Sequence, residues 1–159
     1  METKDKIMSL QELLLQRAQW KKNNEKVVFT NGCFDILHLG HIDYLEKARH
    51  KGERLIIGVN TDESVQRLKG PQRPINNEYA RSRMLAALAF VDAVILFGEE
   101  TPLELIQQII PDILVKGNDY TIDTIVGADV VMTHGGTVET IELVEGFSTT
   151  SIIEKIQKG

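Results

Sequence analysis

The sequence of 159 residues contains one cysteine and four prolines, and aromatic residues make up only 6% of it. The single cysteine, Cys33, excludes a disulfide within the chain, and no cysteine pair is spaced for zinc. Hydrophobic runs stay far below the roughly 20 residues that a transmembrane helix needs. The N-terminal segment mixes both charge signs and lacks the apolar core of a secretory signal. We therefore expect a soluble, cytoplasmic protein with no membrane partner.

Basic residues are also few, with 18 Lys and Arg against 23 Asp and Glu and a formal net charge of -5. General nucleic-acid binders neutralise backbone phosphates with basic residues, so this balance argues against a nucleic-acid partner. It leaves room for a small phosphorylated ligand held by a few local cations. Hydrophobic residues make up 42%, and a chain of this length can bury a core of its own. One domain is the expectation.

Short apolar segments alternate with helical patterns along most of the chain. This alternation predicts βαβ units and an α/β fold, namely a Rossmann-like, doubly wound, mostly parallel five-stranded sheet with helices on both faces. Residues 1–24 are expected to form an N-terminal helical extension and residues 25–159 the main domain. The expected strands are 26–30, 54–59, 93–97, 112–116 and 137–143, and the clearest helices begin after Ser9, near Gly40, at Asn76, at Pro102 within a Thr101–Glu104 capping box, and at Ser148.

In an open α/β sheet, ligands bind beyond the carboxyl ends of the strands. The first expected strand ends at Thr30, so residues 31–41 are the first candidate site. Gly32 allows close backbone approach, and the amides at the start of the next helix favour an anion. His38 and His41 are three residues apart, so they share a face of the first helical turn and can donate hydrogen bonds to phosphate oxygens. Two other interpretations stay open: the pair simply caps or packs the helix, or a metal binds among Cys33, Asp35, His38 and His41.

Residues 67–77 form the longest expected irregular stretch, and it is cationic in an acidic protein. Loops of this kind often carry function. A solvated loop is the alternative interpretation for Lys69 and Arg73. Cys33 is more simply explained as a small buried side chain than as a nucleophile.

The segment Asn31–His41, with the sequence NGCFDILHLGH, resembles the HxGH signature of the nucleotidyltransferase superfamily, to which the cytidylyltransferases belong. The match continues at residues 60–62, at Arg81 ahead of residues 90–92, and at residues 146–150. Within the superfamily the sequence is most similar to the D-glycero-D-manno-heptose 1-phosphate adenylyltransferases, as found in the bifunctional heptose kinase/adenylyltransferase. The stretches that carry this closer resemblance are 30–35, 67–70, 73–76 and 114–120, and the likeness spans about 26–157.

The resemblance implies that ATP and a heptose 1-phosphate give ADP-heptose and pyrophosphate, which supplies heptose for surface glycans such as lipopolysaccharide. Magnesium is expected on the nucleotide phosphates, with no direct protein ligand. The implied catalytic residues are His38, His41, Lys69 and Arg81, with Arg83 as a rival for Arg81. The implied substrate-binding residues are Asp35, Asn60, Asp62 and Lys69. The implied nucleotide-binding residues are Thr30, Asn31, Gly32, Cys33, Phe34, Gly40, His41, Lys116, Gly117, Asp119, Tyr120, Ser148, Thr149 and Thr150.

In the bifunctional relatives a sugar-kinase domain precedes this one, so we expect a free-standing version with a separate heptose 7-phosphate kinase. Relatives of this fold commonly pair, and a homodimer or higher homo-oligomer is expected. The main alternative is a cytidylyltransferase that makes CDP-glycerol from CTP and glycerol 3-phosphate; residues 30–33 and 116–120 favour the heptose enzyme. A nucleotide sensor without catalysis and a fragment of a class I aminoacyl-tRNA synthetase are weaker alternatives, because the catalytic residues are present and the charge does not suit tRNA.

Overall fold

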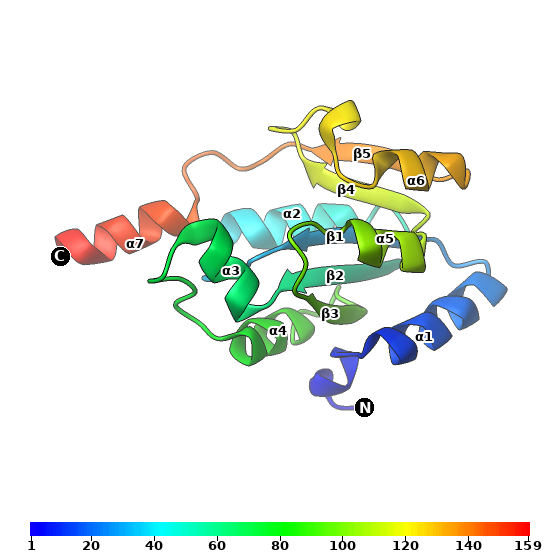
Figure 1. Ribbon diagram of the computed structural model, residues 1–159, viewed down its shortest axis with the longest axis horizontal. Coiled ribbons are helices and arrows are strands. Elements are labelled where there is room, and N and C mark those ends of the chain that lie inside the picture. The colour runs from blue at the N-terminus through cyan, green and yellow to red at the C-terminus, as the bar shows by residue number, and fades with distance from the viewer.

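The computed structural model covers residues 1–159 and has one parallel five-stranded sheet at its centre. The strands lie in the order β3-β2-β1-β4-β5 (Figure 1). The predicted fold class is therefore confirmed, and every strand pair is parallel. The strand bounds are β1 Val27–Gly32, β2 Arg54–Asn60, β3 Ala93–Phe97, β4 Ile113–Gly117 and β5 Thr137–Ile141.

Helices cover both faces of the sheet because successive strand residues point to opposite sides. In β1, Val27 and Phe29 join one hydrophobic cluster, whereas Val28 joins the other. The first cluster is completed by α1, α5 and α6, and the second by α2 and α4. The helix bounds are α1 Leu10–Lys22, α2 Leu39–Arg49, α3 Asp62–Lys69, α4 Glu78–Ala86, α5 Leu103–Ile109, α6 Ala128–Thr133 and α7 Thr149–Lys158, with 3₁₀ turns η1 Thr3–Lys6 and η2 Ile122–Thr124.

The N-terminal segment is part of the domain's hydrophobic core. Helix α1 begins at the predicted capping box: the Ser9 hydroxyl accepts from the Glu12 amide at 3.2 Å, and the Glu12 carboxylate accepts from the Ser9 amide at 2.8 Å. Its residues Leu13 and Trp20 are buried among side chains of the sheet. Within residues 1–24 the helix is Leu10–Lys22, and it packs directly against the rest of the chain.

Three details differ from the sequence prediction. Helix α3 occupies Asp62–Lys69, so the irregular stretch begins at Gly70 and not at Arg67. Helix α6 was also not predicted; like α3 it is short, and six residues are too few to show a helical period. The capping box at Thr101 is wrong, because Pro102 itself is the N-cap of α5. The Thr101 hydroxyl instead accepts from the Leu103 amide at 3.4 Å.

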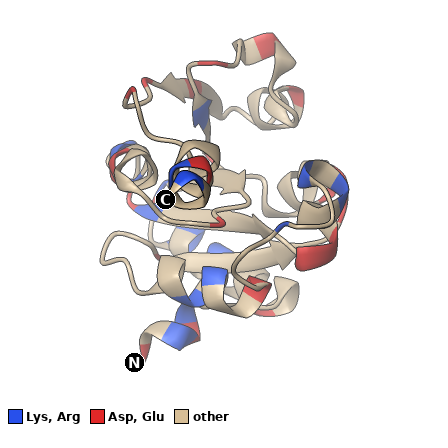
Figure 2. Ribbon diagram, turned by 90° about the vertical axis from the view of Figure 1, so that its left-hand side faces the viewer, with Lys and Arg blue, Asp and Glu red and all other residues tan.

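The carboxyl ends of the strands form one edge of the molecule, where the loop after β1 is flanked by α3 on one side and α7 on the other (Figure 1). Helix α7 projects from this edge, and its first residue, Thr149, donates a hydrogen bond to the Ile36 carbonyl at 3.4 Å. Seen from this side, basic and acidic residues are interspersed without an extended face of one sign (Figure 2). No helix is both long enough and apolar enough to cross a membrane.

Candidate active site

The two histidines lie together at the start of α2, as predicted. His38 is the N-cap of the helix, and its Nδ1 accepts from the His41 amide at 3.4 Å. The two imidazole rings stack with their centroids 3.8 Å apart and an interplanar angle of 22°. Because Nδ1 of a neutral His38 accepts, its Nε2 carries the proton and can donate to a ligand.

Both imidazoles are held in the neutral form at neutral pH. Burial and the neighbouring His38 lower the pKa of His41 from 6.5 to about 4. Burial also lowers the pKa of His38. Nδ1 of His41 is buried without a hydrogen-bond partner. The pair therefore offers uncharged donors at a helix N-terminus, which already favours anions.

His41 is expected to make folding stability depend on pH. Its pKa is about 4 in the folded protein and 6.5 as the ordinary value, so between these values the unfolded chain binds the extra proton. The free energy of unfolding should fall as the pH falls through this window, by up to about 3 kcal/mol from this group. Urea unfolding at the two ends of the window, compared between wild type and His41→Asn, measures the effect. Equal losses in the two proteins would contradict it.

Aromatic side chains and glycines pack tightly around the histidines. The Phe34 ring meets His41 edge-on at 5.3 Å, and the backbone of Phe34 has a φ of 50°. A Cβ on Gly32 would lie 2.9 Å from the Phe34 ring, and one on Gly40 would lie 2.9 Å from the His38 ring. Phe147, which sequence reasoning missed, stacks on His38 at 6.4 Å. The sequence could not reveal this contact, because it forms only where the fold brings the start of α7 to the loop after β1.

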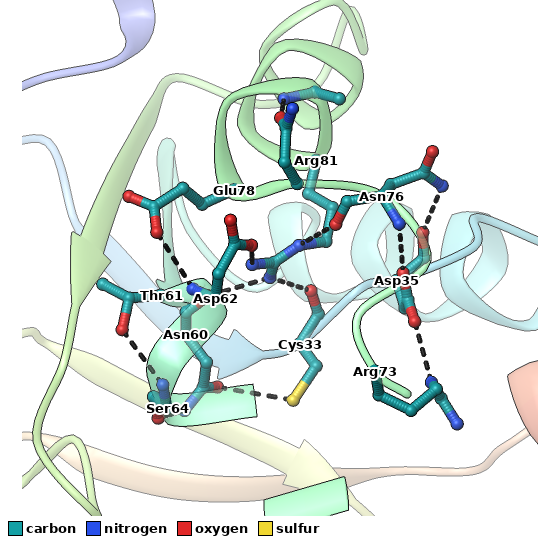
Figure 3. A network of polar contacts seen from close by, with 12 residues as sticks. Cys33, Asp35, Asn60, Thr61, Asp62, Ser64, Arg73, Asn76, Glu78 and Arg81 are labelled. Atoms are coloured by element: carbon teal, nitrogen blue, oxygen red, sulfur yellow. Dashed lines mark hydrogen bonds and ion pairs between the residues drawn. The ribbon is translucent and has the colours of Figure 1, made fainter. Parts of the chain in front are cut away.

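The resemblance implies that Arg81 would hold the β- and γ-phosphates as a catalytic residue, but the structure occupies it elsewhere. Its side chain is 0% exposed, and its guanidinium hydrogen-bonds inside the protein (Figure 3). Nη1 donates to the carbonyls of Cys33 and Asn60 at 2.7 and 2.8 Å, and Nε donates to the Asn76 carbonyl at 2.9 Å. Nη2 pairs with Asp62 at 2.8 Å. Arg81 thus joins the loop after β1, the end of β2 and the segment before α4.

Of the residues predicted to bind the sugar, the structure buries some and leaves others exposed. Asn60 is buried and donates from Nδ2 to the Ser64 hydroxyl at 2.9 Å. Asp62 pairs with Arg81, yet 40% of its side chain is exposed. The Asp35 side chain is 1% exposed and already bonded to Arg73, which leaves it no surface for a sugar hydroxyl. Lys69 remains exposed, at the last position of α3 and not on a loop.

The predicted nucleotide-binding residues lie on two sides of β1. Thr30 is fully buried, and its hydroxyl hydrogen-bonds to the Tyr44 hydroxyl at 2.8 Å, so it supports the site from beneath. At the end of β4, burial lowers the pKa of Lys116 to about 8, and its Nζ lies 5.6 Å from the centre of the Tyr120 ring. A Cβ on Gly117 would lie 2.7 Å from Asp119 Oδ1, so a larger residue here would push the exposed Asp119 side chain aside. Ser148 caps α7 through the Ser151 amide, and Thr149 and Thr150 form the first turn of that helix.

Positive charge gathers around Cys33, in the middle of the edge. Burial raises the pKa of its thiol, while the charges of Lys69, Arg81 and Arg73 act in the opposite direction. The thiol itself lies 3.8 Å from Asn60 Oδ1. The alternative metal site is not assembled, since no three His, Cys, Asp or Glu side chains come together as ligands. The edge is therefore built to hold an anion between neutral imidazoles and local cations.

The fold and this edge define the class of protein. The family model described as cytidylyltransferase-like matches residues 29–155. The chain belongs to that family, and it is a nucleotidyltransferase of the HxGH type.

Two individual proteins match this chain over nearly its whole length. The chain is 56% identical to the "Bifunctional protein HldE" of Magnetococcus marinus over 155 residues, which is 98% of this chain. It is 57% identical to the protein of that name from Pseudomonas fluorescens over 152 residues, or 96% of this chain. In both comparisons the chain spans about a third of the relative, 32% of its length.

Solved structures show the same fold. The lipopolysaccharide core biosynthesis protein of Thermoplasma volcanium is 32% identical with a TM-score of 0.60, covering 76% of this chain and 97% of that one. The pantoate-beta-alanine ligase of Francisella tularensis, complexed with beta-gamma ATP and beta-alanine, is 15% identical with a TM-score of 0.62, covering 96% of this chain and 78% of the ligase. The second likeness shows the fold alone.

Proposed function

We propose that the protein is an adenylyltransferase that converts ATP and D-glycero-D-manno-heptose 1-phosphate to ADP-heptose and pyrophosphate. The observation that carries the proposal is the 56% identity to HldE over 98% of the chain. The neutral histidine pair at the start of α2 supplies the chemistry such a transfer needs. The stretches 30–35 and 114–120, which resemble the heptose enzymes, lie at the same edge of the sheet.

The reaction requires positioning and charge stabilisation more than proton transfer. A sugar phosphate is already an anionic nucleophile near neutral pH, so no strong base is needed. One of its oxygens forms a bond to the α-phosphorus in line with the bond that breaks, whose electron pair leaves with pyrophosphate. His38, His41 and the first amides of α2 would donate to the α-phosphate as charge shifts in the transition state. Lys69, exposed at the end of α3, would neutralise the transferring group.

The remaining nucleotide contacts follow from the layout of the edge. The first turn of α7, at Ser148–Thr150, would hold the β- and γ-phosphates through its amides. The end of β4, at Lys116–Tyr120, would line the base and ribose. Magnesium would enter on the triphosphate oxygens and neutralise their charge, since Mg²⁺ keeps several waters and few protein ligands. The histidine donors and the exposed Lys69 at this edge suit phosphate oxygens that would carry the metal.

The supply of the sugar phosphate and the oligomeric state are part of the same proposal. We expect a heptose 7-phosphate kinase to supply the sugar phosphate in the cytoplasm. We also expect the protein to act as a homodimer or higher homo-oligomer.

Pyrophosphate release decides between this function and the CDP-glycerol alternative. Purified protein with Mg²⁺ would be tested with ATP or CTP against heptose 1-phosphate or glycerol 3-phosphate. We expect release with ATP and the heptose alone. Release with CTP and glycerol 3-phosphate would overturn the substrate assignment while leaving the family standing. No pyrophosphate release in any of the four mixtures would contradict the proposed function.

A further inference from the structure

The loop at residues 70–77, between α3 and α4, is fastened to the loop after β1 by one buried carboxylate. Asp35 accepts from Nε of Arg73 at 2.8 Å and from the amides of Ile75 and Asn76 at 2.9 Å each (Figure 3). In return, Nδ2 of Asn76 donates to the Asp35 carbonyl at 2.7 Å. The Asp35 side chain is 1% exposed, and these bonds together with the positive charge of Arg73 lower its pKa against the effect of burial.

Arg73 is held by this contact on only one edge of its guanidinium. Its Nε is bonded to Asp35, whereas both Nη atoms lack a hydrogen-bond partner and remain open to solvent. The side chain is 17% exposed, so its stem is packed while its outer edge is free. Such a pre-oriented edge, with two parallel N–H donors, matches the oxygens of a phosphate. Holding it in place beforehand also lowers the entropy lost on binding.

The position of the loop indicates which substrate it serves. The proposed nucleotide contacts come from the end of β4, which pairs with β1, and from α7, whose Thr149 reaches the loop after β1. The loop at 70–77 follows β2 and α3, on the other side of β1. Arg73 nevertheless reaches the loop after β1, in the middle of the edge, because its Nε bonds to Asp35 there. A phosphate held between the histidines and Arg73 would therefore come from the acceptor side.

We propose that Arg73 binds the phosphate group of the acceptor sugar phosphate, and that Asp35 is the positioning residue that aims Arg73. The inference rests on the proposed function for the identity of the acceptor. It replaces the direct sugar contact expected of Asp35 from the sequence with an indirect role. It also assigns a binding role to the loop at 70–77. From the sequence alone, a loop that is merely solvated is the alternative interpretation for Arg73.

Steady-state kinetics of Arg73→Lys test the inference. Lysine keeps the charge beside Asp35 but lacks the second donor edge, so the fold should survive. We expect the KM for heptose 1-phosphate to rise about 10- to 100-fold, the loss of a charge-assisted hydrogen bond, with the KM for ATP within about twofold of wild type. Lys22→Gln, an exposed residue at the end of α1, is the matched control and should behave as wild type. An unchanged KM for the acceptor, or an equal rise for ATP, would overturn the assignment.

A second variant tests the positioning role. Asp35→Asn should raise the KM for the acceptor but not for ATP, and combining it with Arg73→Lys should add little, because the two residues act as one unit. Additive effects would contradict the positioning role. If Asp35→Asn does not fold, Arg73→Lys alone still decides on the phosphate contact.

The inference and the proposed function fail in different ways. Wild type that turns over no acceptor contradicts the proposed function. Calorimetric titration with inorganic phosphate then still tests Arg73: binding that is about tenfold weaker in Arg73→Gln supports the contact, and equal binding overturns it.

Discussion

Replacing His41 with alanine is expected to lower kcat by about 100- to 1000-fold, the usual cost of one donor to a developing oxyanion. The fold should survive the change. Nδ1 of His41 is buried without a partner, and burial holds its pKa at about 4, so the imidazole is poorly solvated where it stands. Pyrophosphate release at saturating substrates, together with thermal unfolding, measures both parts of the expectation.

His50→Ala is the matched control for this prediction. His50 lies exposed at the other end of the same helix, and its removal should leave kcat unchanged. A kcat for His41→Ala near that of wild type would refute the phosphate role. A large loss of stability would instead favour the interpretation in which the histidines only pack the helix.

Arg81→Ala is expected to destabilise the protein by about 3–5 kcal/mol, because three carbonyls lose their buried donor and the partly exposed Asp62 loses its ion-pair partner. The carbonyls of Cys33, Asn60 and Asn76 all accept from this guanidinium. Urea unfolding compares the variant with Arg83→Ala, two residues along the same helix. Arg83 contacts the exposed Tyr79, so that control should lose less than about 1 kcal/mol.

Activity separates this structural role from the original prediction. If Arg81 contacts phosphates, Arg81→Ala would fold as stably as wild type yet turn over slowly. The structure predicts the opposite result. Arg81→Ala should lose stability, and its activity should fall because the loop after β1 is no longer held in place. A stable but inactive Arg81→Ala would contradict the network in Figure 3.

Much of the fold could be predicted because its signals are local. Strands β1 to β4 are short, mostly apolar runs that are largely buried, and the capping box at Ser9 is visible in the residues themselves. Helices α3 and α6 were not predicted because both are short, and α3 also carries few hydrophobic residues. The capping box at Thr101 failed because a proline took the N-cap position itself.

The histidine pair could be placed from its spacing alone, whereas the roles of the charged residues could not. Nothing in the sequence tells that Arg81 is fully buried or that the oxygens of Asp35 are occupied. Both facts depend on contacts between segments about 20 to 50 residues apart. The same contacts single out Arg73, whose free edge becomes visible only when its other edge is paired.

The most direct test of the central claim follows the acceptor's phosphate through the reaction. Heptose 1-phosphate labelled with ¹⁸O in its phosphate would be incubated with ATP, Mg²⁺ and the wild-type protein, and the products analysed by mass spectrometry. The proposed attack on the α-phosphorus predicts ADP-heptose that retains the complete label and pyrophosphate that carries none. Label in pyrophosphate, or formation of unlabelled AMP without a nucleotide sugar, would contradict adenylyl transfer to the sugar phosphate.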